Sequence, residues 1–185
     1  MTDSGGAVSP GYVHLVNPAD PNKSDLERLG KDGSFKFKYI AAGEYYLVLN
    51  LRNEAPSEDD APYPRTYYPG VPEPGAAMKI VVAEGGKIEN VTFRVGPPWT
   101  ERVVSGKAVW QDGRTAQNAS ISLYDGKRYV RQFKPDEKGR FNFKVYGDFK
   151  YEIRAEVWGR IQGRSKPLPI GEKSTGLKLV VHPVE

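Results

Sequence analysis

A repeat with an offset of 106 residues is the feature that most constrains how this 185-residue chain can fold. The segment Lys31–Lys38 (KDGSFKFK) lines up with Glu137–Lys144 (EKGRFNFK), and further along Tyr45 lines up with Tyr151. Two copies of one structural unit account for a match that persists over this distance. The sequence therefore predicts two domains that share a fold.

Each copy reads as short strands joined by turns. Phe35 and Phe37 alternate with polar residues, as in a strand with one apolar face, and the preceding Asp32-Gly33 is typical of a turn. No segment has a convincing helical period; Ser24 and Glu27 could form a capping box that supports one turn at most. Strands are expected at residues 34–38, 45–51 and 91–95, and again at 141–145, 151–157 and 177–181.

The boundary between the copies is expected at Gly96-Pro97-Pro98-Trp99, because two prolines interrupt strand pairing and stiffen the connection. The sequence thus predicts an all-β chain of two tandem sandwich domains, residues 1–97 and 98–185.

These motifs resemble a carboxypeptidase regulatory-like domain, an immunoglobulin-like sandwich of the transthyretin (prealbumin) type, similar to the B-type repeats of bacterial collagen adhesins. In the second copy the resemblance rests on Gly106–Val109, Asp112-Gly113, Ala119–Tyr124 and Gly139–Phe143. In the first copy it rests on Val13–Val16, Gly33–Phe37, Gly43–Leu47 and Tyr63–Gly70. The resemblance implies a non-enzymatic spacer or protein-interaction module of a larger exported bacterial protein.

The first domain is expected to lack its opening strand. In the second copy a strand over residues 102–110 precedes Gly113, which stands eight residues before Ile121. Gly5-Gly6 stands about as far before Val13, with only four residues ahead of it. The chain is therefore expected to be a piece of a longer tandem protein, whose first domain has an open edge that invites strand pairing with another chain.

Charge is distributed unevenly between the two halves. Residues 1–97 hold 10 basic and 13 acidic side chains, a net charge of −3, whereas residues 98–185 hold 17 and 10, a net charge of +7. A solvated surface is the simpler interpretation; an acidic polymer as partner is the alternative, and no nucleic-acid motif accompanies the charge. The basic side chains concerned are Arg128, Arg131, Lys134, Arg160, Arg164 and Lys166.

The location of the chain is inferred from the resemblance rather than from a targeting segment. The chain has no cysteine and no apolar run of the length, about 20 residues, that crosses a bilayer, so membrane insertion is not expected. No signal peptide is recognisable in residues 1–10. An extracytoplasmic location, whether secreted, periplasmic or in the cell envelope, is the expectation.

Tests for catalytic or metal chemistry find little, so neither an enzyme nor a cofactor is expected. The two histidines, His14 and His182, stand near opposite ends of the chain, and Glu58-Asp59-Asp60 lacks the alternating spacing of calcium loops. Lys107 could begin the Lys–Asn or Lys–Asp crosslink found in some adhesin repeats, but residues 177–181 offer no Asn or Asp. No crosslink is expected in the second domain.

The long loop over residues 53–77 is the candidate contact surface. Its six prolines would hold three tyrosines in place, and loops of this length are usually functional or disordered. Exposed rings would make a carbohydrate-binding module, the alternative function, with Trp158 as a further candidate; buried rings would instead cover the end of the core. The candidate contacts for a protein or a carbohydrate are Tyr63, Arg65, Tyr67, Tyr68 and Trp99.

Overall fold

A computed structural model describes residues 5–20, 23–172 and 174–184. The chain divides into two compact units, residues 1–99 (unit 1) and 100–185 (unit 2). Both are built of strands, and among the described residues a single short 3₁₀ turn is the one helical element. The predicted all-β class with two tandem sandwich domains is confirmed.

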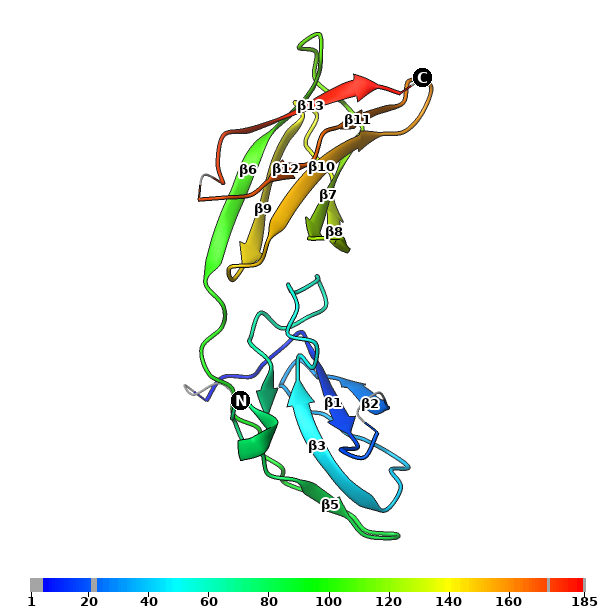
Figure 1. Cartoon of the computed structure of the whole chain (residues 1–185), viewed down its shortest axis with the longest axis vertical. Helices are drawn as coiled ribbons and strands as arrows, with labels where there is room; N and C mark the ends of the chain where they lie inside the picture. The colour runs from blue at the N-terminus through cyan, green and yellow to red at the C-terminus, as the bar shows by residue number, and fades with distance from the viewer. Residues whose placement is uncertain (1–4, 21–22, 173, 185) are drawn as a thin grey trace. The chain divides into compact units, whose positions relative to one another are not determined.

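Unit 2 is a two-layered sandwich (Figure 1). One layer runs β8-β7-β10-β11 and the other runs β13-β6-β9, and pairing of β11 with β13 joins them at one edge. The strands are β6 (Glu101–Trp110), β7 (Ala119–Asp125), β8 (Arg128–Phe133), β9 (Arg140–Tyr146), β10 (Tyr151–Val157), β11 (Gly163–Ser165), β12 (Leu168–Pro169) and β13 (Leu177–Pro183).

Strand β6 lies in the middle of its layer. It pairs in parallel with β13 over five residue pairs and antiparallel with β9 over seven. Its inward-facing Val104 and Ala108 are fully buried in the core. Between them, Gly106 leaves no room for a side chain, because a Cβ would lie 2.6 Å from Cζ of Phe141 and closer still to the carbonyl oxygen of Leu177. Glycine is therefore what lets the two neighbouring strands approach.

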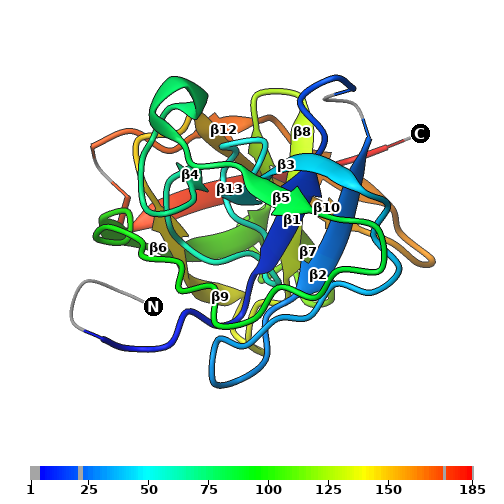
Figure 2. The ribbon, with the colours of Figure 1, turned by 90° about the horizontal axis from the view of Figure 1, so that it is seen from below.

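Unit 1 repeats one layer of this arrangement. Its strands are β1 (Tyr12–Val16), β2 (Ser24–Arg28), β3 (Gly43–Leu49), β4 (Thr66–Tyr67) and β5 (Ile80–Val82), with the 3₁₀ turn η1 at Pro74–Ala76. The order is β2-β1-β3-β4, and β5 also pairs with β3. Strands β1 and β2 lie side by side in both Figure 1 and Figure 2, joined by five antiparallel residue pairs.

The repeat is visible in three dimensions. The order β2-β1-β3 in unit 1 matches β8-β7-β10 in unit 2. The aligned tyrosines make the same contact: the hydroxyl of Tyr45 donates to the carbonyl of Ala41 at 3.0 Å, and that of Tyr151 donates to the carbonyl of Tyr146 at 2.8 Å. Both rings are buried. Burial raises the pKa of Tyr151 to about 12, so this hydroxyl keeps its proton and its donor role.

Two of the predicted strands in unit 1 do not form. Residues 34–38 and 91–95 belong to no named strand, although Phe93 and Val95 are buried and Phe35 packs against the core. Their counterparts in unit 2, β9 and β13, both pair with β6. The described part of unit 1 has no strand in the position of β6, so its second layer packs without forming a regular ladder. The turn considered at Ser24 is also wrong, because those residues form β2.

Contacts of Gly33 and Gly139, which are aligned in the repeat, show which residues of unit 2 correspond to the start of unit 1. The correspondence differs from the alignment of Gly5-Gly6 with Gly113 that the sequence spacing indicated. A Cβ on Gly139 would lie 2.6 Å from the carbonyl oxygen of Ala108, in β6, and one on Gly33 would lie 3.3 Å from the nitrogen of Val8. Val8 is buried in the core of unit 1. The run Gly5–Val8 (GGAV) therefore corresponds to Gly106–Val109 (GKAV), the second half of β6, rather than to the turn at Gly113.

Replacing Gly106 by alanine tests the close approach around β6. The variant should lose about 1–3 kcal/mol of unfolding free energy, because the new methyl group overpacks against backbone and an aromatic ring. Urea denaturation followed by the fluorescence of Trp110 and Trp158 measures the loss. The matched control is Gly171→Ala in the same unit, where a Cβ would meet nothing within 4 Å. Equal stability of the two variants would contradict the packing described for β6.

Candidate functional site

The tyrosine-rich loop of unit 1, residues 53–77, is held in place by backbone and side-chain hydrogen bonds. The side-chain nitrogen Nδ2 of Asn50 donates to the backbone carbonyls of Ala61 and Tyr63, at 2.8 and 2.5 Å. Within the loop, the backbones of Tyr67 and Val71 exchange two hydrogen bonds of 2.7 and 2.8 Å. The loop is therefore an ordered part of the domain, and it contains β4 and η1.

The three tyrosines of this loop pack inward. Tyr67 is 8% exposed and forms a small cluster with Val16 and Val48, and its ring meets that of Tyr46 edge to face at 6.0 Å. Tyr63 and Tyr68 are half-buried and pack against the main core of unit 1. The tyrosines thus cover the core, which is the second of the two interpretations that the sequence left open.

The two other candidate contacts are also tied to the loop. The guanidinium of Arg65 lies 5.7 Å from the centre of the Tyr67 ring, and its backbone nitrogen donates to Asn53 Oδ1 at 2.9 Å. The backbone nitrogen of Trp99 donates to the carbonyl of Pro62 at 2.8 Å. The structure therefore gathers these candidates around one loop, but it does not align the tyrosine rings as an exposed platform for a sugar.

Truncating Tyr67 tests whether its ring is part of the core of unit 1. Because the ring is buried, Tyr67→Ala should lower the unfolding free energy of unit 1 by about 3 kcal/mol. The control Tyr39→Ala removes a fully exposed ring from the same unit and should change stability by less than about 0.5 kcal/mol. Circular dichroism during urea denaturation measures both. A Tyr67 variant as stable as the control would mean that the loop is not part of the core.

The acidic cluster of the same loop is engaged in local contacts. Asp59 forms an ion pair with Arg28 at 2.9 Å. Asp60 accepts hydrogen bonds from the backbone nitrogen and the hydroxyl of Ser57, at 2.9 and 2.7 Å. Across the part of the chain that the structure describes, no group of three or more His, Asp or Glu side chains is placed to hold a metal ion. These carboxylates therefore fasten the loop.

The two histidines lie in different units and have different partners. His14, in β1, is within 3.3 Å of the Ser24 hydroxyl, and His182, in β13, is within 3.1 Å of Gln111 Oε1. Burial and the nearby Arg52 hold the pKa of His14 below its usual value of 6.5, against the weaker opposing effect of Asp60. His14 is therefore mainly neutral near pH 7, inside a strand of unit 1.

The lowered pKa of His14 predicts a pH-dependent stability. The folded state takes up the proton less readily than the unfolded state, so unfolding free energy is lost as the pH falls below about 6.5. His14→Gln should remove this part of the acid sensitivity. Urea denaturation of both proteins at pH 7.5 and pH 5 measures it: the difference in stability between wild type and variant should shift in favour of the variant at pH 5. An identical difference at both pH values would contradict the assignment.

Several of the predicted basic residues of unit 2 form ion pairs or ring contacts within the unit. Arg128 lies 3.9 Å from Asp125, and Arg164 lies 3.7 Å from Glu156 and over the Trp158 ring at 5.7 Å. Arg131 stacks over Phe133 at 4.6 Å and donates to the carbonyl of Lys144. The predicted basic side chains thus serve partly to cover apolar rings, as long cationic stems commonly do.

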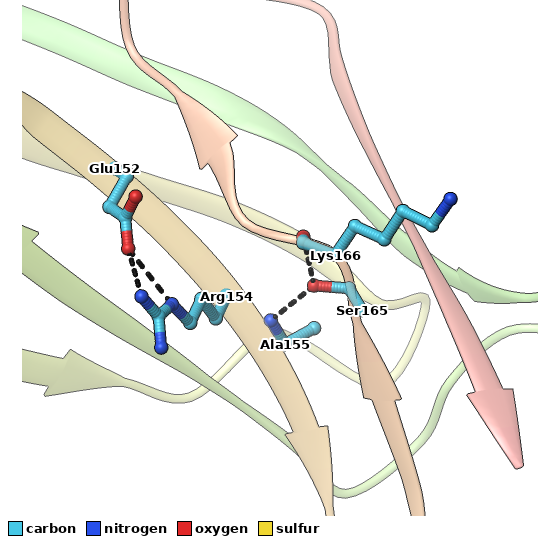
Figure 3. Close-up of polar contacts among 5 residues, drawn as sticks. All are labelled: Glu152, Arg154, Ala155, Ser165 and Lys166. Atoms are coloured by element: carbon cyan, nitrogen blue, oxygen red, sulfur yellow. Dashed lines mark hydrogen bonds and ion pairs between the residues drawn. The ribbon is translucent and has the colours of Figure 1, made fainter.

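Around Lys166 the contacts are structural (Figure 3). The hydroxyl of Ser165 accepts from the backbone nitrogen of Ala155 at 2.9 Å and donates to the carbonyl of Lys166 at 2.9 Å, which ties β11 to β10. Within β10, Arg154 donates two hydrogen bonds to one carboxylate oxygen of Glu152. Neither contact leaves a group poised for chemistry.

A second cluster of basic residues shares only Lys134 with the set predicted from the sequence, and its other members were not predicted as a site. An open groove of about 890 Å³ on unit 2 is lined by cationic side chains from four places in the chain, with Ser105 and Asn142 beside them. No motif marks this set, because only strand register brings its members together. The cationic side chains are Lys107, Lys134, Arg140 and Lys178.

Comparison with known proteins identifies no family. No protein-family model matches the chain, and no curated protein matches it.

Among the described residues, no helix is long and apolar enough to span a bilayer.

Similar chains among solved structures include proteins from two bacteria. GBS52, the minor pilin of Streptococcus agalactiae, has 10% identity and a TM-score of 0.41, covering 97% of this chain and 85% of that one. The Bacillus anthracis TIE protein has 16% identity and a TM-score of 0.38; all of this chain aligns with 33% of its length. At these values the likeness carries no argument about function.

Proposed function

We propose that the chain is a non-enzymatic spacer or protein-interaction module of a larger exported bacterial protein, made of two carboxypeptidase regulatory-like domains with their boundary near Pro97. The resemblance of the motifs to that family supports this proposal, as does the layer order of unit 2, β8-β7-β10-β11 over β13-β6-β9. An extracytoplasmic location, with protein as the partner, belongs to the same proposal.

One observation carries the spacer role: the first and last strands of unit 2 are neighbours and run parallel. Strand β6 begins at Glu101 and β13 ends at Pro183, and the two pair from Gly106↔Leu177 to Trp110↔Val181. Interstrand hydrogen bonds run across the strands rather than along them. Pulling the ends of the unit apart therefore slides the two strands past each other and loads all five pairs together.

The small cavity in unit 1 also favours a structural role. It measures about 170 Å³ and is lined mainly by apolar core side chains, including Val8, Phe35 and Val91. Such a lining offers dispersion contacts but neither an acid nor a base. The arrangement is that of a packed domain whose second layer is loosely joined.

Single-molecule pulling tests the spacer role, and the absence of native cysteine makes attachment simple. With handles at the two ends of unit 2, the unit should unfold in one step at high force, because the β6–β13 pairs break together. The control attaches handles through cysteines introduced at Gln117 and Lys134, exposed positions that flank the antiparallel β7–β8 hairpin. Pulling there peels one pair at a time and should need clearly less force. Equal forces in the two geometries would overturn the mechanical role.

A further inference from the structure

The outer face of the sheet β13-β6-β9 in unit 2 carries three cations in one row. Lys107 on β6 is the register partner of Lys178 on β13 and of Arg140 on β9. All three side chains are exposed, and adjacent strands are about 4.8 Å apart. Like charges directly opposite one another destabilise a sheet, so this row is unfavourable unless something neutralises it.

Only one member of the row is neutralised within the described chain. Asp136 pairs with Arg140 at 2.8 Å, and its other oxygen accepts from the backbone nitrogens of Lys138 and Arg140. Asp136 is therefore fully engaged with its own turn. Lys107 and Lys178 have no ion-pair partner among the residues that the structure describes, and the same holds for Lys134 at the groove's rim.

The groove floor supplies hydrogen-bonding groups next to these cations. Ser105 and Asn142 are register partners on β6 and β9, two pairs along from Lys107 and Arg140 and therefore on the same face, and both line the groove. Phe141 lines the groove but is 4% exposed, so its ring offers no face on which a nucleobase could stack. Strand β6 is hydrogen-bonded on both sides, so it cannot take up a peptide by strand addition.

We propose that this groove binds an anionic polysaccharide, with Lys107, Lys178 and Lys134 contacting its carboxylate, sulfate or phosphate groups and with Ser105 and Asn142 contacting its hydroxyl groups. Lysine suits such a site because its ammonium is a compact point charge that pairs with an anion from many directions. The inference goes beyond the spacer role and does not depend on it. It names a ligand class that a purely mechanical unit would not need.

The proposal predicts opposite effects of one substitution on stability and on binding. Lys107→Ser removes the central charge of the row, so the melting temperature of the free protein should rise by roughly 1–5 °C. The same change should weaken binding to heparin, a sulfated polysaccharide, by roughly twofold to fivefold, which corresponds to the loss of one ion pair in an exposed site. A residue with only a structural role would not give a gain of stability together with a loss of binding.

The matched control is Lys127→Ser, which makes the same charge change at an exposed turn between β7 and β8. Titration calorimetry of the whole chain with heparin and with polygalacturonate compares the variants, with uncharged dextran as the neutral polymer. The expected result is a larger loss for Lys107→Ser than for Lys127→Ser, no binding of dextran, and affinity that falls with salt.

Three results would overturn the proposal. They are equal losses for the two variants, which would indicate net charge alone; a Lys107 variant that melts lower than wild type; and poly-glutamate or single-stranded DNA binding as tightly as the glycans. The pulling experiment is unaffected by any of these results, so failure of this inference and failure of the spacer role are distinguishable.

Discussion

The pairing of β6 with both β13 and β9 is the interaction on which the structure of unit 2 depends. It places Val104 and Ala108 in the core and brings the first and last strands of the unit side by side. Gly106 makes this possible, since any side chain there would collide with neighbouring backbone. The mechanical role and the row of cations on the outer face both follow from that one strand: the same register that joins β6 to β13 also sets Lys107 beside Lys178.

Unit 1 shows what the same sequence pattern becomes where the described residues form no strand in the position of β6. Its strands β2, β1 and β3 match β8, β7 and β10 of unit 2, and the buried tyrosine hydroxyl contact is kept. The segments 34–38 and 91–95 still direct apolar side chains to the core, but they are not joined as a ladder. Hydrophobic alternation is thus sufficient to pack a layer, whereas regular strand structure also requires a neighbour with which to exchange hydrogen bonds.

This difference explains how much could be predicted from the sequence. Local signals were enough for the all-β class, the repeat, and strands such as β3, β9 and β10, because alternation and turn residues act over a few positions. The missing ladder at 34–38 could not be predicted from its own residues, since its Phe35-x-Phe37 pattern matches that of β9. The same limit applies to β2, whose Ser24 and Glu27 fit a capping box equally well.

Prediction of the candidate site from the sequence was limited in the same way, because burial and strand register depend on residues that are distant in the chain. Proline and tyrosine content marked the loop at 53–77, but burial of Tyr67 depends on Val16 and Val48, which are distant in sequence. Lys107, Arg140 and Lys178 are also far apart in the chain, and only strand register makes them neighbours. Such a set can be found from sequence only once strand pairing is known.

Native-state hydrogen exchange tests the central claim most directly, because amides in a stable ladder exchange only when that part of the structure opens. The account predicts that the amides of β6 and β9 are among the slowest in the chain, while those of Phe35–Lys38 exchange orders of magnitude faster despite their matching sequence. Equal protection of Phe35–Lys38 and β9 would show that unit 1 has a complete ladder, and would contradict the claim that β6 is what distinguishes the two units.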